Sequence, residues 1–181
     1  VMPMGRLIAS VILFSFMMPN LAAPAAFAEP PPSLYEERKQ LFVEMEGLTH
    51  IPWYYLAGLD QFERSIQSVR QDKEKKEGLV AISIPDHLWA GPLNPNPKDQ
   101  HPFSIQFFGG MGRDGDGDGR ADPNNDRDVL YTMASFLAQY GFTEEDIRIG
   151  LWEYYKRDAT VRIISEMAAI YKHFGRLDLN S

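Results

Sequence analysis

Residues 114–119 constrain the folding of this chain more than any other segment, because they place three carboxylates at alternate positions. The run is Asp114-Gly-Asp116-Gly-Asp118-Gly119. Alternation directs the three acidic side chains toward a common centre, and Gly119 permits a sharp turn after them. Like charges gathered at one centre repel one another strongly without a cation. The segment therefore predicts a metal-binding loop, and its simpler interpretation is a solvated acidic loop.

This spacing is the first half of an EF-hand loop, which binds Ca²⁺ through oxygen atoms. An EF-hand closes with a bidentate glutamate at its twelfth position, where this chain has Asn125. The closing carboxylate must therefore come from another residue. Asp128 is the better candidate because it opens the helix expected next, and Asp126 and Asp122 are the alternatives. The predicted ligands of a structural calcium are Asp114, Asp116, Asp118, the carbonyl of Arg120, and Asp128.

The first 28 residues have the pattern of a secretory signal. Arg6 precedes an apolar run at residues 7–18, and a small-x-small cleavage signal follows at residues 26–28. The apolar run is shorter than the roughly 20 residues with which a helix crosses a membrane. We therefore expect a cleaved signal peptide over residues 1–28, a secreted mature protein and no permanent membrane span.

The charge balance excludes one class of partner. The chain has 18 Lys and Arg against 25 Asp and Glu, and the signal peptide contributes only Arg6 to these counts. Because so acidic a protein is a poor ligand for nucleic acid, we expect no nucleic-acid partner. The sequence contains no cysteine, so a bound metal would be a useful crosslink for an exported domain without disulfides.

The remaining pattern is that of one mainly helical domain. Ser33 and Glu36 form a capping-box pattern at the start of a helix that runs to about residue 47, and Pro52 suits the start of the next helix. Residues 80–85 alternate like a short strand that ends at a proline. Residues 90–102 have the Gly, Pro and Asn content of a loop. Three more helices are expected at about residues 127–140, 144–156 and 159–174.

Several of these features resemble a known family, the lytic transglycosylases with a lysozyme-like fold. The acidic loop and the helix that opens at Asp128 are similar to the calcium loop and next helix of that family. The family's catalytic helix begins with a hydrophobic-Pro pair and reaches its catalytic glutamate eleven residues after the proline. Here Ile51-Pro52 leads to Glu63 at that spacing.

Two weaker motifs occur in the same order as in the family. Residues 104–107, which include Gln106, resemble a segment with a Met-Gln pair, and Tyr154 lies in a match to a Tyr-Asn segment. The sequence is also similar to the amino-terminal domain of some Gram-positive cell-wall proteins with a lysostaphin-type zinc endopeptidase domain, although its four histidines do not form that peptidase's ligand pattern. The resulting domain prediction is a signal peptide at 1–28, a Pro-rich linker and N-terminal helix at 29–49, a lysozyme-like transglycosylase domain at 50–175 and a tail at 176–181.

The resemblance implies a peptidoglycan lytic transglycosylase that cleaves the MurNAc-GlcNAc bond and leaves 1,6-anhydro-MurNAc ends. Glu63 would be the general acid and base, because Leu59 and Ile66 place it beside an apolar helix face, where desolvation raises a carboxyl pKa. Asp60 lies on the same helix and cannot readily face Glu63 across a sugar, so the second carboxylate of a hydrolase is missing. The substrate-binding residues that the resemblance implies are Gln106 and Tyr154.

A second function stays open at this point: a catalytically silent glycan-binding or scaffold module of a cell-wall hydrolase system. Glu63 would then be a surface residue in an ion pair with Arg64 or Lys73. The aromatic residues that would stack on sugars under either function are Trp53, Tyr54 and Trp89. The expected partners are peptidoglycan glycan strands and a cell-wall peptidase or amidase.

Overall fold

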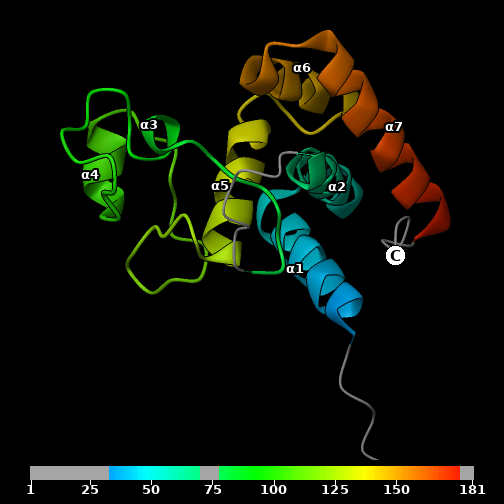
Figure 1. Cartoon of the computed structure of the whole chain (residues 1–181), viewed down its shortest axis with the longest axis horizontal. Coiled ribbons are helices and arrows are strands. Elements are labelled where there is room, and N and C mark those ends of the chain that lie inside the picture. Colours follow the sequence, from blue (N-terminus) through cyan, green and yellow to red (C-terminus); the bar gives the residue numbers. More distant parts are fainter. Residues whose placement is uncertain (1–32, 70–77, 176–181) are drawn as a thin grey trace, which may run out of the picture. The chain divides into compact units, whose positions relative to one another are not determined.

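The computed structural model describes residues 33–69 and 78–175, which belong to one compact unit of residues 32–181. The predicted signal peptide at 1–28 and tail at 176–181 lie outside the described residues. Within the described ranges, no helix is long and apolar enough to cross a membrane. The helices of this part, shown in Figure 1, are α1 (Leu34–Thr49), α2 (Trp53–Val69), α3 (Asp86–Trp89), α4 (Pro102–Phe107), α5 (Asp126–Ala138), α6 (Glu144–Tyr155) and α7 (Asp158–Phe174).

The boundaries of the long helices follow the capping residues. Ser33 and Glu36 form the predicted capping box at the start of α1, and Thr143 and Asp146 form a second one at the start of α6. Helix α7 ends at Gly175, which has a left-handed backbone with φ of 61°. These local hydrogen bonds satisfy backbone groups that a helix end leaves free. The mainly helical fold class is therefore confirmed.

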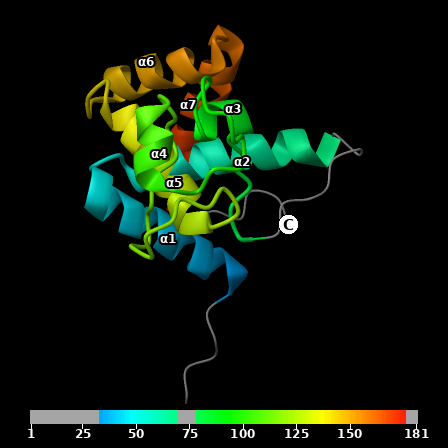
Figure 2. The same ribbon diagram turned by 90° about the vertical axis from the view of Figure 1, so that its left-hand side faces the viewer.

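The five long helices form a closed ring of contacts. Helix α2 packs against α7, α7 against α6, α6 against α5, α5 against α1, and α1 against α2. Figures 1 and 2 show α2 crossing the middle of the unit with these helices around it. The most extensive of these interfaces joins α2 to α7. The two helices can approach each other closely because α2 has a glycine, Gly58, at the contact. A Cβ atom at this position would lie 2.9 Å from the backbone of Ala168.

Residues 80–85 do not form the strand that their alternation predicted, and the described residues contain no β-strand. The N–H groups of Leu79 and the next residue donate to the carboxylate of Asp126, at 2.8 and 3.2 Å. The N–H of Ala81 donates to Asp60 at 2.5 Å. Because carboxylates accept from these donors, the extended segment needs no neighbouring strand. Most of its side chains are nevertheless in the core: the buried ones are Val80, Ala81, Ile82 and Ile84.

The expected loop at 90–102 lies between two short helices that the sequence did not predict. Helix α4 begins after His101, whose ring Nδ1 accepts the N–H of Ser104 at 3.4 Å, and Pro102 occupies its first turn. The side chain of Asp99 accepts hydrogen bonds from Asn94 and Ser104, at 2.9 and 2.5 Å. These side-chain contacts hold the loop against the start of α4.

Candidate functional site

The predicted metal loop brings three of its carboxylates together. Oxygen atoms of Asp114, Asp116 and Asp128 all lie within 4.8 Å of one another. Among the described residues, this is the one group of His, Cys, Asp or Glu side chains close enough to hold a metal ion. Asp118 is not in the group, and its carboxylate accepts the N–H of Arg120 at 2.8 Å.

Asp128 is the innermost acid of the loop and has no exposed surface. One of its oxygens accepts the N–H of Gly115 and the other that of Asp122, both at 2.7 Å. Burial raises the pKa of the Asp128 carboxyl, the two backbone hydrogen bonds lower it, and the charges of Asp116 and Asp114 raise it further. A cation beside these acids would remove that repulsion.

Asn125 occupies the position at which an EF-hand has its closing glutamate. Its side-chain nitrogen donates to Asp116 at 2.6 Å, and its side-chain oxygen accepts the N–H of Arg127 at 2.9 Å. Asn125 is thus the N-cap of α5 as well as a brace for the loop. The loop is consequently joined rigidly to the first turn of α5, which carries Asp128.

Glu63, the predicted catalytic residue, is partly exposed on α2. The hydroxyl of Tyr155 donates a hydrogen bond to it at 2.5 Å. Burial raises the pKa of Tyr155, and the negative charge of Glu63 raises it further. Burial and then the charge of Glu63 likewise raise the pKa of Tyr154. Glu63 is therefore bonded to Tyr155, whose ring packs against that of Tyr154 with centroids 4.8 Å apart, whereas Gln106 is exposed on α4.

The buried acid of α2 is Asp60, which was not expected to face Glu63 across a sugar. It is 2% exposed and accepts hydrogen bonds from Ala81 at 2.5 Å and from Arg64 at 3.1 Å. Burial raises the pKa of Asp60, and the nearby Arg64, the Ala81 N–H and Arg38 lower it. Arg64, which the alternative interpretation paired with Glu63, therefore forms its ion pair with Asp60. Lys73, the other expected partner of Glu63, lies outside the described residues.

The aromatic residues expected to stack on sugars differ in their surroundings. Trp89 is 1% exposed and donates its indole N–H to the carbonyl of Ala121 at 3.1 Å, so the expectation that it binds a sugar is wrong. Trp53 and Tyr54 are partly buried. The ammonium of Lys39 lies 5.0 Å from the Trp53 ring and that of Lys172 lies 5.2 Å from the Tyr54 ring.

The histidines do not come together. His50 follows α1, His87 lies in α3, His101 precedes α4 and His173 lies in the last turn of α7. All four are exposed. Since the metal-competent group of the described residues contains no histidine, the chain's histidines do not form a zinc site with one another.

Comparison with known proteins shows similarity to a peptidase. The chain is 46% identical over 176 residues to an L-Ala–D-Glu endopeptidase of Bacillus subtilis (strain 168). The match includes 97% of this chain and 53% of the relative, so the chain spans about half the length of that protein. No family model matches the chain, and no solved structure matches it.

This similarity overturns the predicted assignment as a lytic transglycosylase. The relative's name denotes cleavage of a peptide bond, whereas a lytic transglycosylase cleaves a glycosidic bond. The prediction was wrong because it rested on the acidic loop and on helix spacing. Those features describe a fold, and a fold does not determine which bond a protein cleaves.

Proposed function

We propose that this chain is part of an exported enzyme that cleaves peptides of peptidoglycan, and that its helical unit binds the enzyme to the cell wall. Its similarity over nearly its whole length to an L-Ala–D-Glu endopeptidase supports this. An L-Ala–D-Glu bond joins an L-residue to a D-residue, and this linkage occurs in the stem peptides of peptidoglycan. Those peptides lie outside the cytoplasm, in agreement with the signal peptide expected at residues 1–28.

The share of the relative that this chain matches supports the proposed binding role: the match covers 53% of that protein, so about half of it lies outside the match. The catalytic zinc sites of peptidases include histidine ligands, and a cysteine peptidase needs a thiol. The four histidines are exposed on separate elements, and the sequence has no cysteine. We therefore assign wall binding to the helical unit and peptide cleavage to a part of the protein outside the described residues.

Helix α4 provides a surface suited to wall binding. Phe103 and Phe107 lie one turn apart, and their side chains are 73% and 74% exposed. Because the loop at 90–102 and the hydrogen bonds of Asp99 brace this short helix, the rings are held out on a supported element. Exposed apolar surface of this kind marks an interaction site, and ring stacking against wall polymer would bury it.

We further infer that the acidic loop binds a structural Ca²⁺ through Asp114, Asp116, Asp118, the carbonyl of Arg120, and Asp128. Three of these carboxylates lie within 4.8 Å of one another, and all of the donors are hard oxygen atoms, which Ca²⁺ prefers. Bound calcium would offset their charge repulsion. It would thereby fix the loop against α5.

Sedimentation with purified sacculi tests the wall-binding role. The wild-type chain should pellet with the sacculi, and a Phe103→Ala/Phe107→Ala double variant should bind about tenfold more weakly, as expected when two central rings of an interface are lost. The matched control is a Phe142→Ala/Phe174→Ala variant, which removes rings that are 54% and 63% exposed on other elements. Wild-type protein that stays in the supernatant would contradict the proposal.

A further inference from the structure

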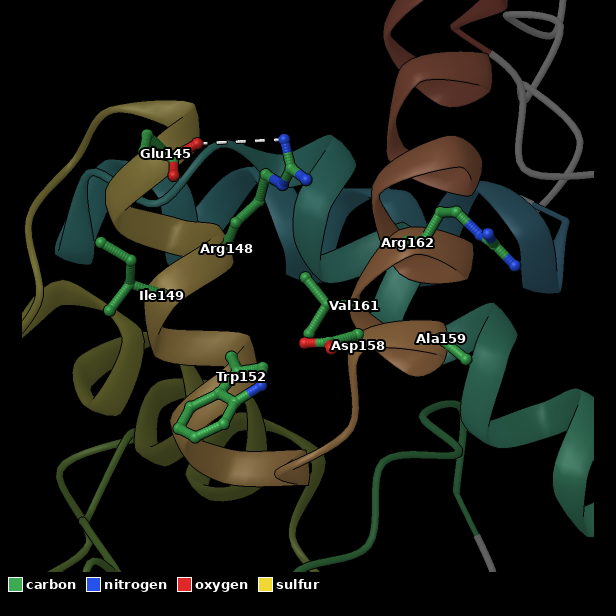
Figure 3. A pocket seen from close by; sticks show the side chains of 8 residues that line it. All are labelled: Glu145, Arg148, Ile149, Trp152, Asp158, Ala159, Val161 and Arg162. Carbon is green, nitrogen blue, oxygen red and sulfur yellow. Dashed lines mark ion pairs between the residues drawn. The ribbon is translucent and has the colours of Figure 1, made fainter.

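A groove between α6 and α7 is separate from the acidic loop and from Glu63. Its volume is about 490 Å³, which is within the usual size of a small-ligand site, roughly 300–1,000 Å³. The two helices that form it are consecutive, and the turn between them includes Lys156 in a left-handed conformation with φ of 52°. Figure 3 shows the guanidinium of Arg148 and the side chains of Asp158 and Val161 between the two helices, and the ring of Trp152, which also lines the groove, over the last turn of α6.

The groove has an aromatic wall and an apolar floor. Trp152 is 41% exposed, although tryptophan is the largest apolar side chain and a ligand that covers its ring would gain hydrophobic contact. Val161 is buried at the floor. The ammonium of Lys156 lies 4.7 Å from the Trp152 ring, so this ring already attracts a cation.

Each wall carries one acidic and one basic side chain, Glu145 and Arg148 on α6 and Asp158 and Arg162 on α7. Arg148 on α6 has its guanidinium 3.8 Å from Glu145, and both side chains are more than half exposed. Because exposed pairs of this kind contribute little, a ligand carboxylate can replace Glu145 and gain the paired hydrogen bonds that a guanidinium offers. Asp158 stands on α7, across the groove, and makes no ion pair with any described residue.

We propose that this groove binds the stem peptide of peptidoglycan, an inference that rests on the proposed function. A stem peptide carries free carboxylates and, at its diamino acid, an ammonium group. Arg148 binds a carboxylate, Asp158 binds the ammonium, and Trp152 covers the apolar part of the backbone and side chains. The N-acetylated sugars of the glycan have no ammonium group that would pair with Asp158, and this difference favours the peptide.

Nuclear magnetic resonance of the full chain tests this directly, because the sequence has three tryptophans. The probe is the soluble tripeptide L-alanyl-γ-D-glutamyl-diaminopimelate. It should shift the indole N–H signal of Trp152 and leave that of Trp89, which is buried and bonded to Ala121, in place. Titration with an N-acetylglucosamine tetramer is the parallel experiment. A Trp152 shift with the sugar and none with the tripeptide would overturn the peptide assignment.

Variants in the groove supply a second readout. Trp152→Ala and Arg148→Ala should each weaken tripeptide binding by about tenfold, equal to about 1.4 kcal/mol. Phe142→Ala, an exposed aromatic residue that does not line the groove, should bind as wild type does. Unchanged tripeptide affinity in both groove variants overturns the inference, and so does a wild-type chain that pellets with sacculi but does not bind the tripeptide. Failure to pellet with sacculi would instead count against the proposed function.

Discussion

The hydroxyl of Tyr155 donates a hydrogen bond to Oε1 of Glu63 across 2.5 Å, and so joins the last turn of α6 to α2. The Tyr155 ring also packs edge-on against Phe62, with centroids 5.6 Å apart, and against Tyr154 at 4.8 Å. Helices α2 and α6 are both neighbours of α7 in the ring of helices. The contact between Tyr155 and Glu63 therefore joins α6 directly to α2, in addition to the contacts that each helix makes with α7.

Tyr155→Phe should lower the free energy of unfolding, because it removes the donor to Glu63 and leaves the ring contacts intact. Hydrogen bonds to charged groups contribute about 1.5–3 kcal/mol, and partial hydration of Glu63 in the variant should reduce the loss to about 1–2 kcal/mol. Urea denaturation measures the difference. Tyr140→Phe is the control, with an expected change within about 0.5 kcal/mol. Equal losses in the two variants would show that the hydrogen bond to Glu63 adds nothing to the free energy of unfolding.

Two glycine substitutions should change stability in opposite directions. An alanine Cβ at position 58 would lie 2.9 Å from the backbone of Ala168 and Ile164, so Gly58→Ala should destabilise the fold by about 1–3 kcal/mol. Gly47 in α1 has no atom within 4 Å of the added Cβ, and Gly47→Ala should stabilise by about 0.5–1 kcal/mol. Thermal unfolding of both variants measures this, and a neutral Gly58→Ala would contradict the close α2–α7 contact.

The parts of the fold that could be predicted are those determined by neighbouring residues. The capping boxes at Ser33 and Thr143 and the end of α7 at Gly175 depend on contacts within three or four positions, which a sequence displays directly. The segment at 80–85 was misread because its backbone donors bind Asp60 and Asp126, acids about 20 and 46 positions away in the chain. Alternation predicts that the apolar Val80, Ile82 and Ile84 are buried, but it predicts neither the burial of Ala81 nor the acids that satisfy the backbone.

The candidate site divides in the same way. The acidic loop is local, and three of the five predicted ligands lie together as carboxylates at Asp114, Asp116 and Asp128. The surroundings of Glu63 depend on Tyr155, 92 positions later, and no local pattern indicates that contact. The groove between α6 and α7 was missed because Trp152 and Asp158 become parts of one site only after the two helices turn back on each other.

The pKa of Asp99 gives a prediction for acidic solution. Hydrogen bonds from the Asn94 side chain, the Ser104 hydroxyl and the His101 N–H lower the pKa of this carboxyl from 3.8 to about 2. Because its pKa is lower in the folded protein, ionised Asp99 stabilises the folded loop at pH values above its ordinary pKa of 3.8. This stabilisation disappears as the pH falls from 3.8 toward about 2. Carbon-13 titration of the side-chain carboxyl measures the pKa, and Asn94→Ala should raise it. A midpoint near 3.8 in the wild type would contradict the hydrogen-bonded loop.

Removal of calcium should lower the melting temperature. A ligand that binds only the folded state stabilises it by about 2.7 kcal/mol at a hundredfold excess over its Kd. A chelator should therefore lower the melting temperature by several degrees, about 4 °C or less per kcal/mol for a domain of this size. Asp128→Asn, which removes one of the clustered carboxylates, should show no further response to the chelator. An identical wild-type melting curve with and without chelator, in protein free of metal, would rule out the site.

In the proposed function the helical unit binds peptidoglycan, and another part of the protein cleaves the peptides. The most direct test is to incubate the purified chain with sacculi, pellet them, and analyse both fractions by quantitative protein assay and mass spectrometry. We expect the chain in the pellet and no peptide released by cleavage between L-Ala and D-Glu. Release of such peptides by this chain would place a peptidase centre within it and contradict the account, and so would a chain that remains in the supernatant.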